Sequence, residues 1–404
     1  MSSIEPVEWR NEMKAKKITI SFLAFCLASL CCGCQETPQE VRERMNSYGE
    51  NKQMASQERT YCTVAELKEA KLPDADMGLD NIILPQGVDF SEIENIAILS
   101  LSFEENYTEN KDEAIDLFEI DEHSLTSDTF DEERNMGRTV IYDSPAHEKY
   151  LAVEDNGFVS FISGLTYDYI NGKAHYGSTL EKYDLQAEDI SGRKVELADG
   201  EADIAKVRES AEKWLNEKMP MKGCEYHISD AYVRELDSTG ENKKQLSFYA
   251  EVLCGGMRFN SYASKEPADN AQVDFYMHGI QLNYDGSGQM SFFSNGVGKI
   301  NVDSRQEIKE VIDLRSAIQL MNEEMSGFSE LKITKILPMY VLYPQYKTDE
   351  ELYSVPGQKI EGRPVYAFLI AEGTDDTEFG INKSNAYKVI FVDMVTGEVT
   401  TNIG

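Results

Sequence analysis

Three short segments share a pattern that restricts much of this chain to hairpins of β-strands. Each has a strand-like run, a short turn with a glycine, and then Val or Met followed by Ser or Thr. The segments are residues 153–160, 284–291 and 393–400. Glycine fits such turns because it adopts positive φ without steric cost. We therefore predict that these are the last hairpins of three related units, and that their shared residues are structural rather than catalytic.

Two of the units also contain a helical pattern. Apolar residues recur at steps of 3, 4 and 3 in both places, which gives one apolar helical face. These residues are Ile204, Val207, Ala211 and Trp214 in one unit, and Val311, Leu314, Ile318 and Met321 in the other. We expect an amphipathic helix in each unit.

Strand patterns follow the second helix. Alternating apolar residues predict a half-buried antiparallel strand, and two more apolar runs complete its sheet. The alternating residues are Leu337, Met339, Val341 and Tyr343, and the two runs are 365–370 and 387–392. The predicted fold class is therefore α+β, as tandem modules of one helix packed on a small antiparallel sheet.

The N-terminal part of the chain contains an export signal. Basic residues precede an apolar run at 18–30 that is too short to span a bilayer comfortably. The basic residues are Lys14, Lys16 and Lys17. The signal resembles that of bacterial lipoproteins, in which a small residue precedes the cysteine that receives a diacylglyceryl group. Gly33 and Cys34 fit these two positions, whereas Cys31 stands where leucine is usual.

The signal also divides the chain. Residues 1–12 carry three glutamates, the wrong sign for the start of a signal, so we expect translation to begin at Met13 and the first twelve residues to be a gene-model extension. The polar residues after Cys34 predict a flexible tether. The predicted divisions are 1–12 (extension), 13–33 (signal peptide), 34–60 (tether), 61–200 (N-terminal module), 201–300 (middle module) and 301–404 (C-terminal module).

Charge and composition exclude several classes of function. The 404 residues are 41% hydrophobic, enough for a packed core, and the net charge of −33 opposes nucleic-acid binding. Residues 104–134 hold thirteen acids and two bases, which we interpret as a solvated acidic loop; whether it binds cations is left open. The sequence has no HExxH, GxSxG or phosphate-loop motif, and its histidines lack metal-ligand spacing. We expect no catalytic residues, metal or cofactor.

The helix-then-strands order, with the ending YKVIFVDMVTGEV at 387–399, resembles PepSY-like modules and YycH/YycI-type extracytoplasmic proteins of Gram-positive bacteria. It is also similar to uncharacterised clostridial lipoproteins. The resemblance covers roughly residues 200–404. It implies binding or regulation outside the cell, such as holding a protease or sensor kinase in check, and no catalytic residues are carried over.

Two later cysteines, Cys224 and Cys254, lie on predicted strands joined at 237–240. Pairing around Thr239 would place them directly opposite each other. Two outcomes fit this arrangement: a cross-strand disulfide, as is common outside the cytosol, or two buried thiols in an anaerobic organism.

The function that fits these patterns is a lipid-anchored extracytoplasmic binding or regulatory protein, not an enzyme. Its expected location is the outer face of the cell membrane, and its expected partners are the membrane, through the lipid on Cys34, and an envelope protein or peptide. Two alternatives stay open: a structural lipoprotein of the cell envelope, and a surface hydrolase that uses two carboxylates.

Overall fold

The computed structural model describes residues 59–73, 77, 79, 81–131, 137–171, 174–185, 189–238, 241–259, 280–286, 288–295, 298–326, 331–344, 356–370 and 388–401. The predicted signal peptide, Cys34 and the tether up to residue 58 lie outside these residues. The folded body begins at Thr60. In the described part of the chain, no helix combines the length and apolar character needed to cross a membrane.

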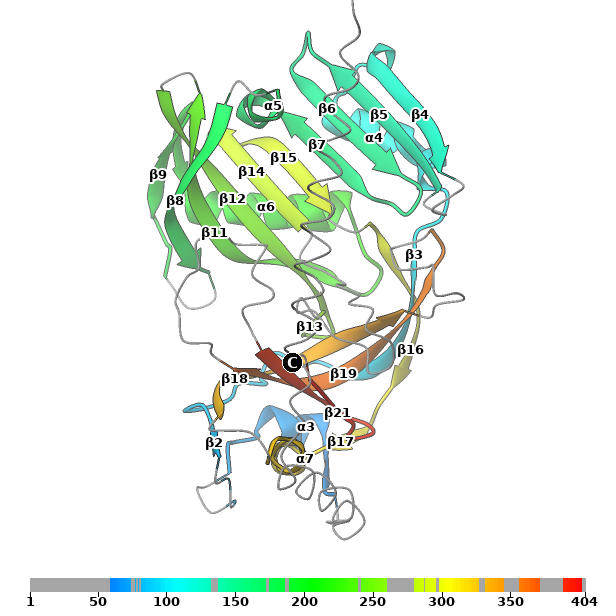
Figure 1. Cartoon of the computed structure of the whole chain (residues 1–404), viewed down its shortest axis with the longest axis vertical. Helices are drawn as coiled ribbons and strands as arrows, with labels where there is room; N and C mark the ends of the chain where they lie inside the picture. The colour runs from blue at the N-terminus through cyan, green and yellow to red at the C-terminus, as the bar shows by residue number, and fades with distance from the viewer. Residues whose placement is uncertain are drawn as a thin grey trace, which may run out of the picture. The chain divides into compact units, whose positions relative to one another are not determined.

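Nine of the described strands form one antiparallel sheet (Figure 1). They are β4 (Leu125–Asp131), β5 (Gly137–Ser144), β6 (Lys149–Glu154), β7 (Val159–Ser163), β8 (Ala174–Asp184), β11 (Glu225–Ser238), β12 (Glu241–Cys254), β14 (Ile280–Gly286) and β15 (Gln289–Asn295). Their order across the sheet is β4-β5-β6-β7-β15-β14-β12-β11-β8. Strands from two separate stretches of sequence are thus joined edge to edge where β7 pairs with β15.

A second group of strands is centred on β19. Its members are β3 (Ala97–Phe103), β16 (Ile300–Glu307), β18 (Leu331–Pro344), β19 (Lys359–Ile370), β20 (Lys388–Asp393) and β21 (Val399–Thr401). Strand β19 pairs with β18 along its length, with β3 at its start and with β20 at its end. Strand β3 also pairs with β16, and β20 with β21. All of these pairings are antiparallel.

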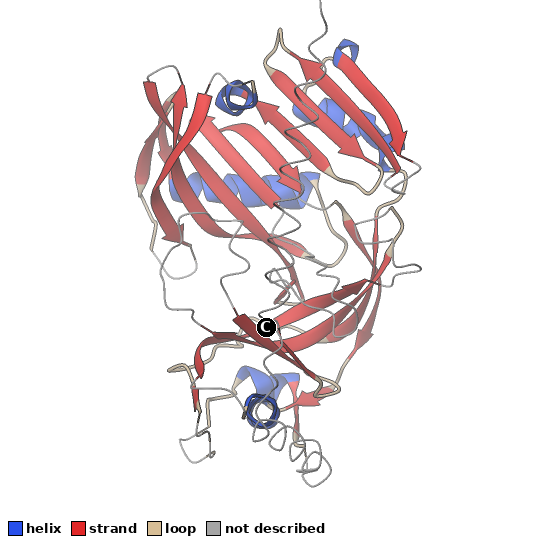
Figure 2. Ribbon diagram, in the orientation of Figure 1, coloured by secondary structure: helices blue, strands red, loops and turns tan. Residues whose placement is uncertain are grey.

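Two short strands add parallel pairings to β18. They are β2 (Ile82–Ile83) and β13 (Met257–Phe259). Because β13 also forms a hairpin with β12, it links the two groups of strands. The chain is therefore a mixed α/β protein dominated by strands in a large mixed sheet, whereas the expected sheets were small (Figure 2).

The three hairpins predicted from sequence are all present, as β6–β7, β14–β15 and β20–β21. Their turn glycines, Gly157, Gly288 and Gly397, have φ of +81°, +94° and +73°. This confirms the reason for which glycine was expected there, because a side chain would strain the backbone at these angles.

The described helices are short, and several of them pack against strands. They are α3 (Val64–Lys68), η1 (Tyr107–Asn110), α4 (Lys111–Phe118), η2 (Glu122–Ser124), α5 (Gly164–Ile170), α6 (Ile204–Lys218) and α7 (Leu314–Met325). Both predicted amphipathic helices exist. The Asp203 carboxylate accepts from the Lys206 N–H at the start of α6, and Asp313 does the same for Ser316 at the start of α7.

The buried faces of these two helices follow the predicted spacing with two errors. Trp214 was expected on the buried face of α6, but it is only half-buried and Leu215 is buried in its place. The buried residues are Ile204, Val207, Ala211 and Leu215 in α6, and Leu314, Ser316, Ala317, Ile318, Met321 and Met325 in α7. Val311 was assigned to the second helix, but it lies in the strand β17 (Glu310–Ile312). The cap at Asp313 explains the error, because a helix begins after its capping residue and cannot include Val311.

The first described residues are attached to α7. Strand β1 (Tyr61–Thr63) pairs antiparallel with β17. The Thr60 N–H donates to Ser316 Oγ at 3.1 Å, the Asp313 N–H donates to the Thr60 carbonyl at 3.0 Å, and the Thr60 hydroxyl donates to the Asp313 carboxylate. The chain therefore enters the body at the N-terminal end of α7.

Strand β18 is buried on both faces, not half-buried as its alternation predicted. One face contributes Ile336, Tyr340 and Leu342 to the main core. The other contributes Met339 and Val341 to a smaller cluster, which also includes side chains of β19 and β20. Alternation was misleading because Tyr340 is a core residue here, with no exposed surface.

The acidic segment 104–134 is folded where it is described, up to residue 131, so the loop interpretation was wrong. It contains η1, α4, η2 and β4. In α4 the apolar residues Ala114, Ile115 and Phe118 are buried while the acids lie on the other side of the helix. A helix of this length can be mostly acidic in composition and still fold, because one apolar stripe is enough to attach it to a core.

Aromatic side chains gather under the junction of β7 and β15. Phe161 of β7 is opposite Phe293 of β15, and Phe118 of α4 stacks on Phe161 with ring centroids 4.4 Å apart. Trp214 of α6 meets Phe293 at 5.2 Å, edge to face. We call these four residues the junction cluster. Stacked and edge-to-face rings attract each other, so the cluster stabilises the fold by more than the burial of its apolar surface alone.

Candidate functional site

The two predicted cysteines are neighbours at the open end of the β11–β12 hairpin. The ladder pairs Glu225 with Leu253, so the next position places Cys224 opposite Cys254. Both thiols are free, and a hydrogen bond joins their sulfur atoms. The sequence correctly predicted this juxtaposition; the disulfide itself stays a prediction.

A bulge in β11 is responsible for the alignment of the cysteines. At the closed end of the hairpin Ser238 pairs with Glu241. If this register continued along both strands, Cys224 would lie opposite Gly255, one position beyond Cys254. The register shifts between Ile228 and Asp230, where β11 has one extra residue. This shift restores the pairing around Thr239 that the sequence suggested.

An arginine that the sequence did not point to completes the site. Arg305 of β16 places its Nη2 atom 3.1 Å from the Cys254 sulfur and 3.7 Å from the Cys224 sulfur. The same nitrogen donates to the Gly223 carbonyl. Gly223 has φ of +70°, and a Cβ at this residue would collide with the guanidinium. The glycine therefore gives the arginine its access to both sulfurs.

The two thiols have opposite shifts in pKa. The pKa of Cys254 is lowered, first because the Cys224 S–H donates to its sulfur, and also because Arg305 is close; burial opposes both effects. The pKa of Cys224 is raised by the same hydrogen bond and by burial. A negative charge in this pair is therefore held on Cys254, with Cys224 as the proton donor.

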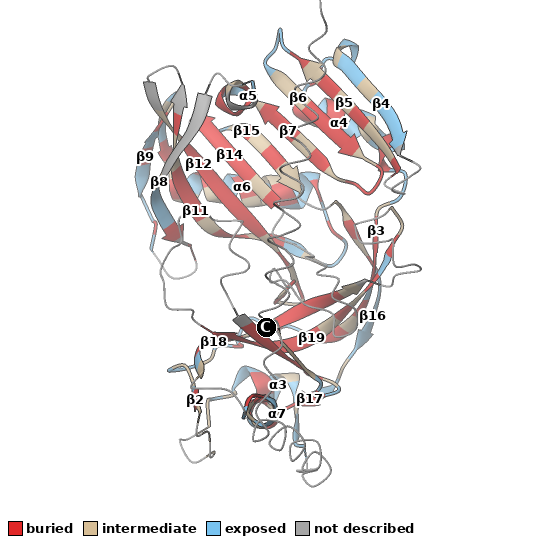
Figure 3. Cartoon of the chain, viewed as in Figure 1, coloured by how far each residue is buried: buried red, intermediate tan, exposed pale blue. Residues whose placement is uncertain are grey.

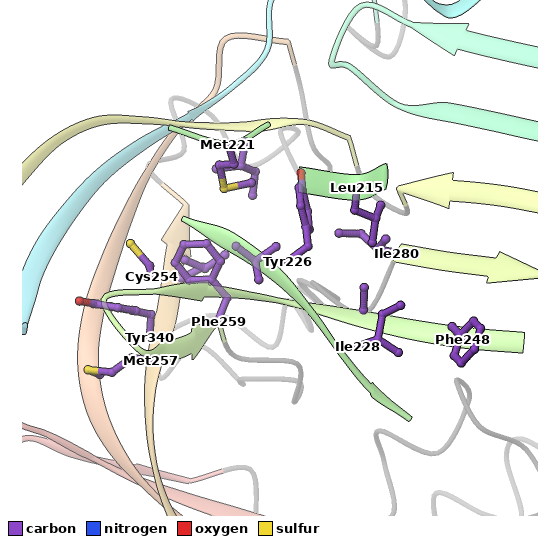
Figure 4. Close-up of a cluster of buried hydrophobic side chains, with 14 of the residues drawn as sticks. Leu215, Met221, Tyr226, Ile228, Phe248, Cys254, Met257, Phe259, Ile280 and Tyr340 are labelled. Carbon is purple, nitrogen blue, oxygen red and sulfur yellow. The ribbon is translucent and has the colours of Figure 1, made fainter. Parts of the chain in front are cut away.

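Cys254 is almost fully buried, at 1% exposed, and Cys224 is partly exposed. Figure 4 shows Cys254 in the same apolar cluster as Met257, Phe259 and Tyr340. The turn after Cys254 is fixed in place, because the Glu94 N–H donates to the Gly255 carbonyl at 2.9 Å. The site thus has an apolar floor and one cationic group beside the sulfurs.

Each of the three hairpins also contains a buried aspartate next to its turn. These are Asp155, Asp285 and Asp393, which are 5%, 5% and 6% exposed. Asp155 accepts from the Arg138 N–H at 2.6 Å, and Asp393 from the Thr396 N–H at 2.7 Å. These carboxylates satisfy backbone donors at turns and helix starts, as expected of structural groups.

Asp285 belongs to a larger buried polar network. Gln245 of β12 donates from Nε2 to Asp285 Oδ1 at 2.5 Å, to Thr166 at 2.8 Å and to Ser291 at 3.0 Å. The Asn283 side chain donates to Gln245 Oε1 at 3.1 Å. Burial raises the pKa of Asp285, while the bonds from Ser291, Gln245 and the Leu165 N–H oppose that shift. We refer to Thr166, Gln245, Asn283, Asp285 and Ser291 as the polar core.

The remaining candidate groups have no common site. Cys62 lies on β1, which pairs with β17 in a two-stranded sheet separate from the hairpin of the paired thiols. Burial, together with Asp313 and Glu66, raises the pKa of Cys62 to about 11. Within the described ranges, no three or more His, Cys, Asp or Glu side chains are placed to hold a metal ion. A hollow of about 330 Å³ lies between α4 and the end of α6, with Glu113, Asp116 and Glu217 in its lining.

Comparison with known proteins gives only remote similarity. No protein-family model and no curated protein sequence matches the chain. Among solved structures, an uncharacterized protein from Eubacterium rectale is 11% identical with a TM-score of 0.46, covering 83% of this chain and 96% of its own. The C-terminal domain of YpeB from Bacillus megaterium is 11% identical with a TM-score of 0.30, covering 74% and 99%. At such low values neither similarity indicates a function.

Proposed function

We propose that this chain is a lipid-anchored extracytoplasmic binding protein, held on the outer face of the cell membrane through Cys34. The observation that carries the proposal is the order of basic flank, short apolar run and Gly33-Cys34 near the N-terminus. A diacylglyceryl group supplies two acyl chains, and each buried methylene contributes about 0.8 kcal/mol to membrane binding. Two chains suffice to hold a folded body at a membrane surface.

In this proposal the body consists of tandem PepSY-like modules, each with one helix on an antiparallel sheet. Three contacts support this division: α4 with β6, α6 with β11, and α7 with β20. Each helix thus belongs with one hairpin: α4 with β6–β7, α6 with the strands that end in β14–β15, and α7 with β20–β21. The buried aspartate at every hairpin is a further common feature.

The lipid anchor predicts the outcome of one substitution. Cys34→Ser is expected to abolish incorporation of an alkyne-tagged fatty acid into the protein and to release it from the membrane fraction, since serine cannot form the thioether. Metabolic labelling followed by fractionation measures both effects. Cys31→Ser is the matched control and should label normally. Undiminished labelling of Cys34→Ser, or an unlabelled wild-type protein, would contradict the proposal.

We place the binding surface at strand β4, the end of the nine-stranded sheet. In the described part of the chain β4 pairs only with β5, and most of its residues are exposed (Figure 3). Leu125 and Phe130 are 48% and 64% exposed, which is unusual for large apolar side chains on an edge strand. A side-chain contact adds to the pairing of β4 with β5, because Arg138 donates to both oxygens of Asp128 at 2.6 and 2.5 Å.

The chemistry of β4 favours one kind of partner. An open strand edge binds an extended peptide by adding it as a further strand. Strand β4 has the sequence LTSDTFD, without a lysine or arginine, and it lies within the strongly acidic segment 104–134. A cationic extended segment of an envelope protein would therefore fit its edge and its charge.

A matched pair of double variants tests this surface. Full-length protein should bind a fluorescent peptide of alternating lysine and valine more tightly than one of alternating glutamate and valine. Leu125→Lys/Phe130→Lys is expected to weaken binding of the lysine peptide about tenfold or more, because it places two positive charges at the edge. Fluorescence anisotropy at several salt concentrations provides the affinities.

The control for this test is Leu180→Lys/Tyr61→Lys, which adds the same charge at exposed apolar residues on β8 and β1. This control should retain most of the affinity. If both double variants lose affinity equally, the peptide responds only to the net charge of the protein, and β4 is not the binding surface.

A further inference from the structure

We propose that Cys224, Cys254 and Arg305 form a redox-reversible thiol pair, in which Cys254 is oxidised first and Cys224 then closes the disulfide. The pair is separate from the binding edge at β4, so its test does not depend on the proposed function. The first observation behind it is position: opposite residues of antiparallel strands have Cα atoms about 4.5–5.5 Å apart, within the span that a disulfide needs. The two cysteines directly follow the last pair of the β11–β12 ladder, Glu225 with Leu253, and Arg305 Nη2 reaches both of their sulfur atoms.

The second observation is the asymmetry of the site. Arg305 Nη2 is closer to Cys254 than to Cys224, at 3.1 Å against 3.7 Å. The Cys224 S–H donates toward the same Cys254 sulfur. A guanidinium and a thiol donor both stabilise a thiolate, which is the reactive form of cysteine. Cys254 therefore carries the nucleophile, and Cys224 keeps its proton until it is needed.

The charge of Arg305 also bears on whether the two cysteines are suited to oxidation or to binding a metal ion. Two thiols alone are a ligand set for soft metal ions. A fixed positive charge 3.1 Å from one sulfur repels a metal cation but stabilises an anionic sulfur. The geometry accordingly favours a redox site over a metal site.

The oxidation balances with a peroxide as the oxidant. The Cys254 thiolate attacks one oxygen of hydrogen peroxide, the O–O bond breaks, and the products are a sulfenic acid and hydroxide, which takes the proton of Cys224 to form water. The Cys224 thiolate then attacks the Cys254 sulfur and expels hydroxide, which is protonated by solvent. Two thiols lose two electrons in total, and one peroxide becomes two waters. A dithiol reductant reverses the change.

Oxidation would also change how two parts of the fold are connected. Arg305 lies on β16, which pairs with β3, whereas the cysteines lie on the hairpin of the nine-stranded sheet. In the reduced state Arg305 Nη2 contacts the Cys254 sulfur across this boundary at 3.1 Å and favours its thiolate form. A disulfide sulfur cannot carry that charge, so oxidation leaves the Gly223 carbonyl as the partner of Arg305 at this site.

The test uses the full-length chain with its four N-terminal cysteines, Cys26, Cys31, Cys32 and Cys34, replaced by serine. After treatment with hydrogen peroxide, non-reducing peptide mapping should find a Cys224–Cys254 crosslink that has lost the mass of two hydrogens. Dithiothreitol should restore both thiols. Cys62 is the internal control and should stay reduced, since its pKa is raised.

Single variants assign the roles. In Cys224→Ser, which lacks the resolving thiol, Cys254 should gain two or three oxygen atoms. In Cys254→Ser, Cys224 should remain reduced under the same conditions. Arg305→Ala should slow oxidation of Cys254 about tenfold, and Arg305→Lys should slow it less because the charge is kept. Circular dichroism establishes that each variant is folded.

Three results would overturn the inference. The first is oxidation of Cys224 in preference to Cys254, which reverses the roles. In the chain with only its four N-terminal cysteines replaced, the second is a faster reaction of Cys62 than of either paired thiol. The third is that no crosslink forms in that chain at any peroxide concentration that leaves the fold intact. Since that chain keeps Cys62 and the whole site, the inference is testable even if a further variant fails to fold.

Discussion

Replacing Gln245 by leucine is expected to destabilise the protein by about 3–5 kcal/mol. Gln245 has no exposed surface and connects Asp285, Thr166, Ser291 and Asn283 in the polar core. Leucine has a similar size but no hydrogen-bonding group. The substitution therefore removes the donor to Asp285 Oδ1 and the acceptor of the Asn283 side-chain N–H, and both of these groups are buried. Losing partners inside the protein costs far more than losing one exposed hydrogen bond.

The cost should depend on pH in a defined direction. Burial raises the pKa of Asp285 from its ordinary value of 3.8, so the folded state holds this proton more tightly than the unfolded state. Stability from this group therefore falls as the pH rises from the unfolded to the folded pKa. Without Gln245 the folded pKa rises further, so the variant continues to lose stability at higher pH. The difference from wild type should be largest at neutral pH and shrink on acidification.

Urea unfolding at several pH values measures this difference. Gln281→Leu is the matched control: Gln281 donates to Asn283 at 2.9 Å and is only partly buried. It should cost less than about 1.5 kcal/mol, the usual contribution of one hydrogen bond. Equal costs for Gln245→Leu and Gln281→Leu, with no dependence on pH, would mean that the polar core does not stabilise the fold.

Phe293→Ala is the second substitution with a large expected effect, about 3–5 kcal/mol. Phe293 is fully buried in the junction cluster, with ring centroids 5.7 Å from Phe118 and 5.2 Å from Trp214. Alanine would leave a cavity where β15 joins β7 and where α4 and α6 both pack. The loss should be cooperative, because all four elements share this contact.

The neighbouring residue supplies the control for this substitution. Phe292 is on the opposite face of β15 and is only partly buried, so Phe292→Ala should cost less than half as much. Thermal unfolding followed by circular dichroism gives the stabilities, and Trp214 fluorescence reports on the cluster itself, with Trp9 replaced by phenylalanine. A larger cost for Phe292→Ala would show that the junction is not where this sheet is stabilised.

Periodicity and turn patterns in the sequence predicted the helices α6 and α7 and the three hairpins. The apolar steps beginning at Ile204 predicted α6, and the turn glycines predicted all three hairpins, because both signals arise from neighbours in sequence. The sequence also brought the two cysteines to neighbouring strands of one hairpin, but it did not show the bulge in β11 that aligns Cys224 with Cys254. The pattern failed at Val311 and Tyr340, where a helix cap and burial on two faces altered the expected arrangement.

The contacts that join distant segments gave no such signal. Arg305 is an exposed residue of β16, which pairs with β3, and it meets Cys254 of β12 only through tertiary packing. Gln245 lies in the polar run ENKKQ, where nothing distinguishes a core residue from a surface one. The junction of β7 with β15 joins residues more than a hundred positions apart. Such contacts depend on tertiary packing, which a single sequence does not encode as a local pattern.

The attachment of Thr60 to α7 determines where mechanical load would enter the body. Strand β1 lies along β17, and Thr60 is bonded to Asp313 and Ser316 at the first turn of α7. If the protein is anchored to a membrane through the residues before Thr60, a force on the anchor would act first on the first turn of α7. The C-terminal hairpin β20–β21 contacts the same helix, so the force would reach this hairpin before it reached β4.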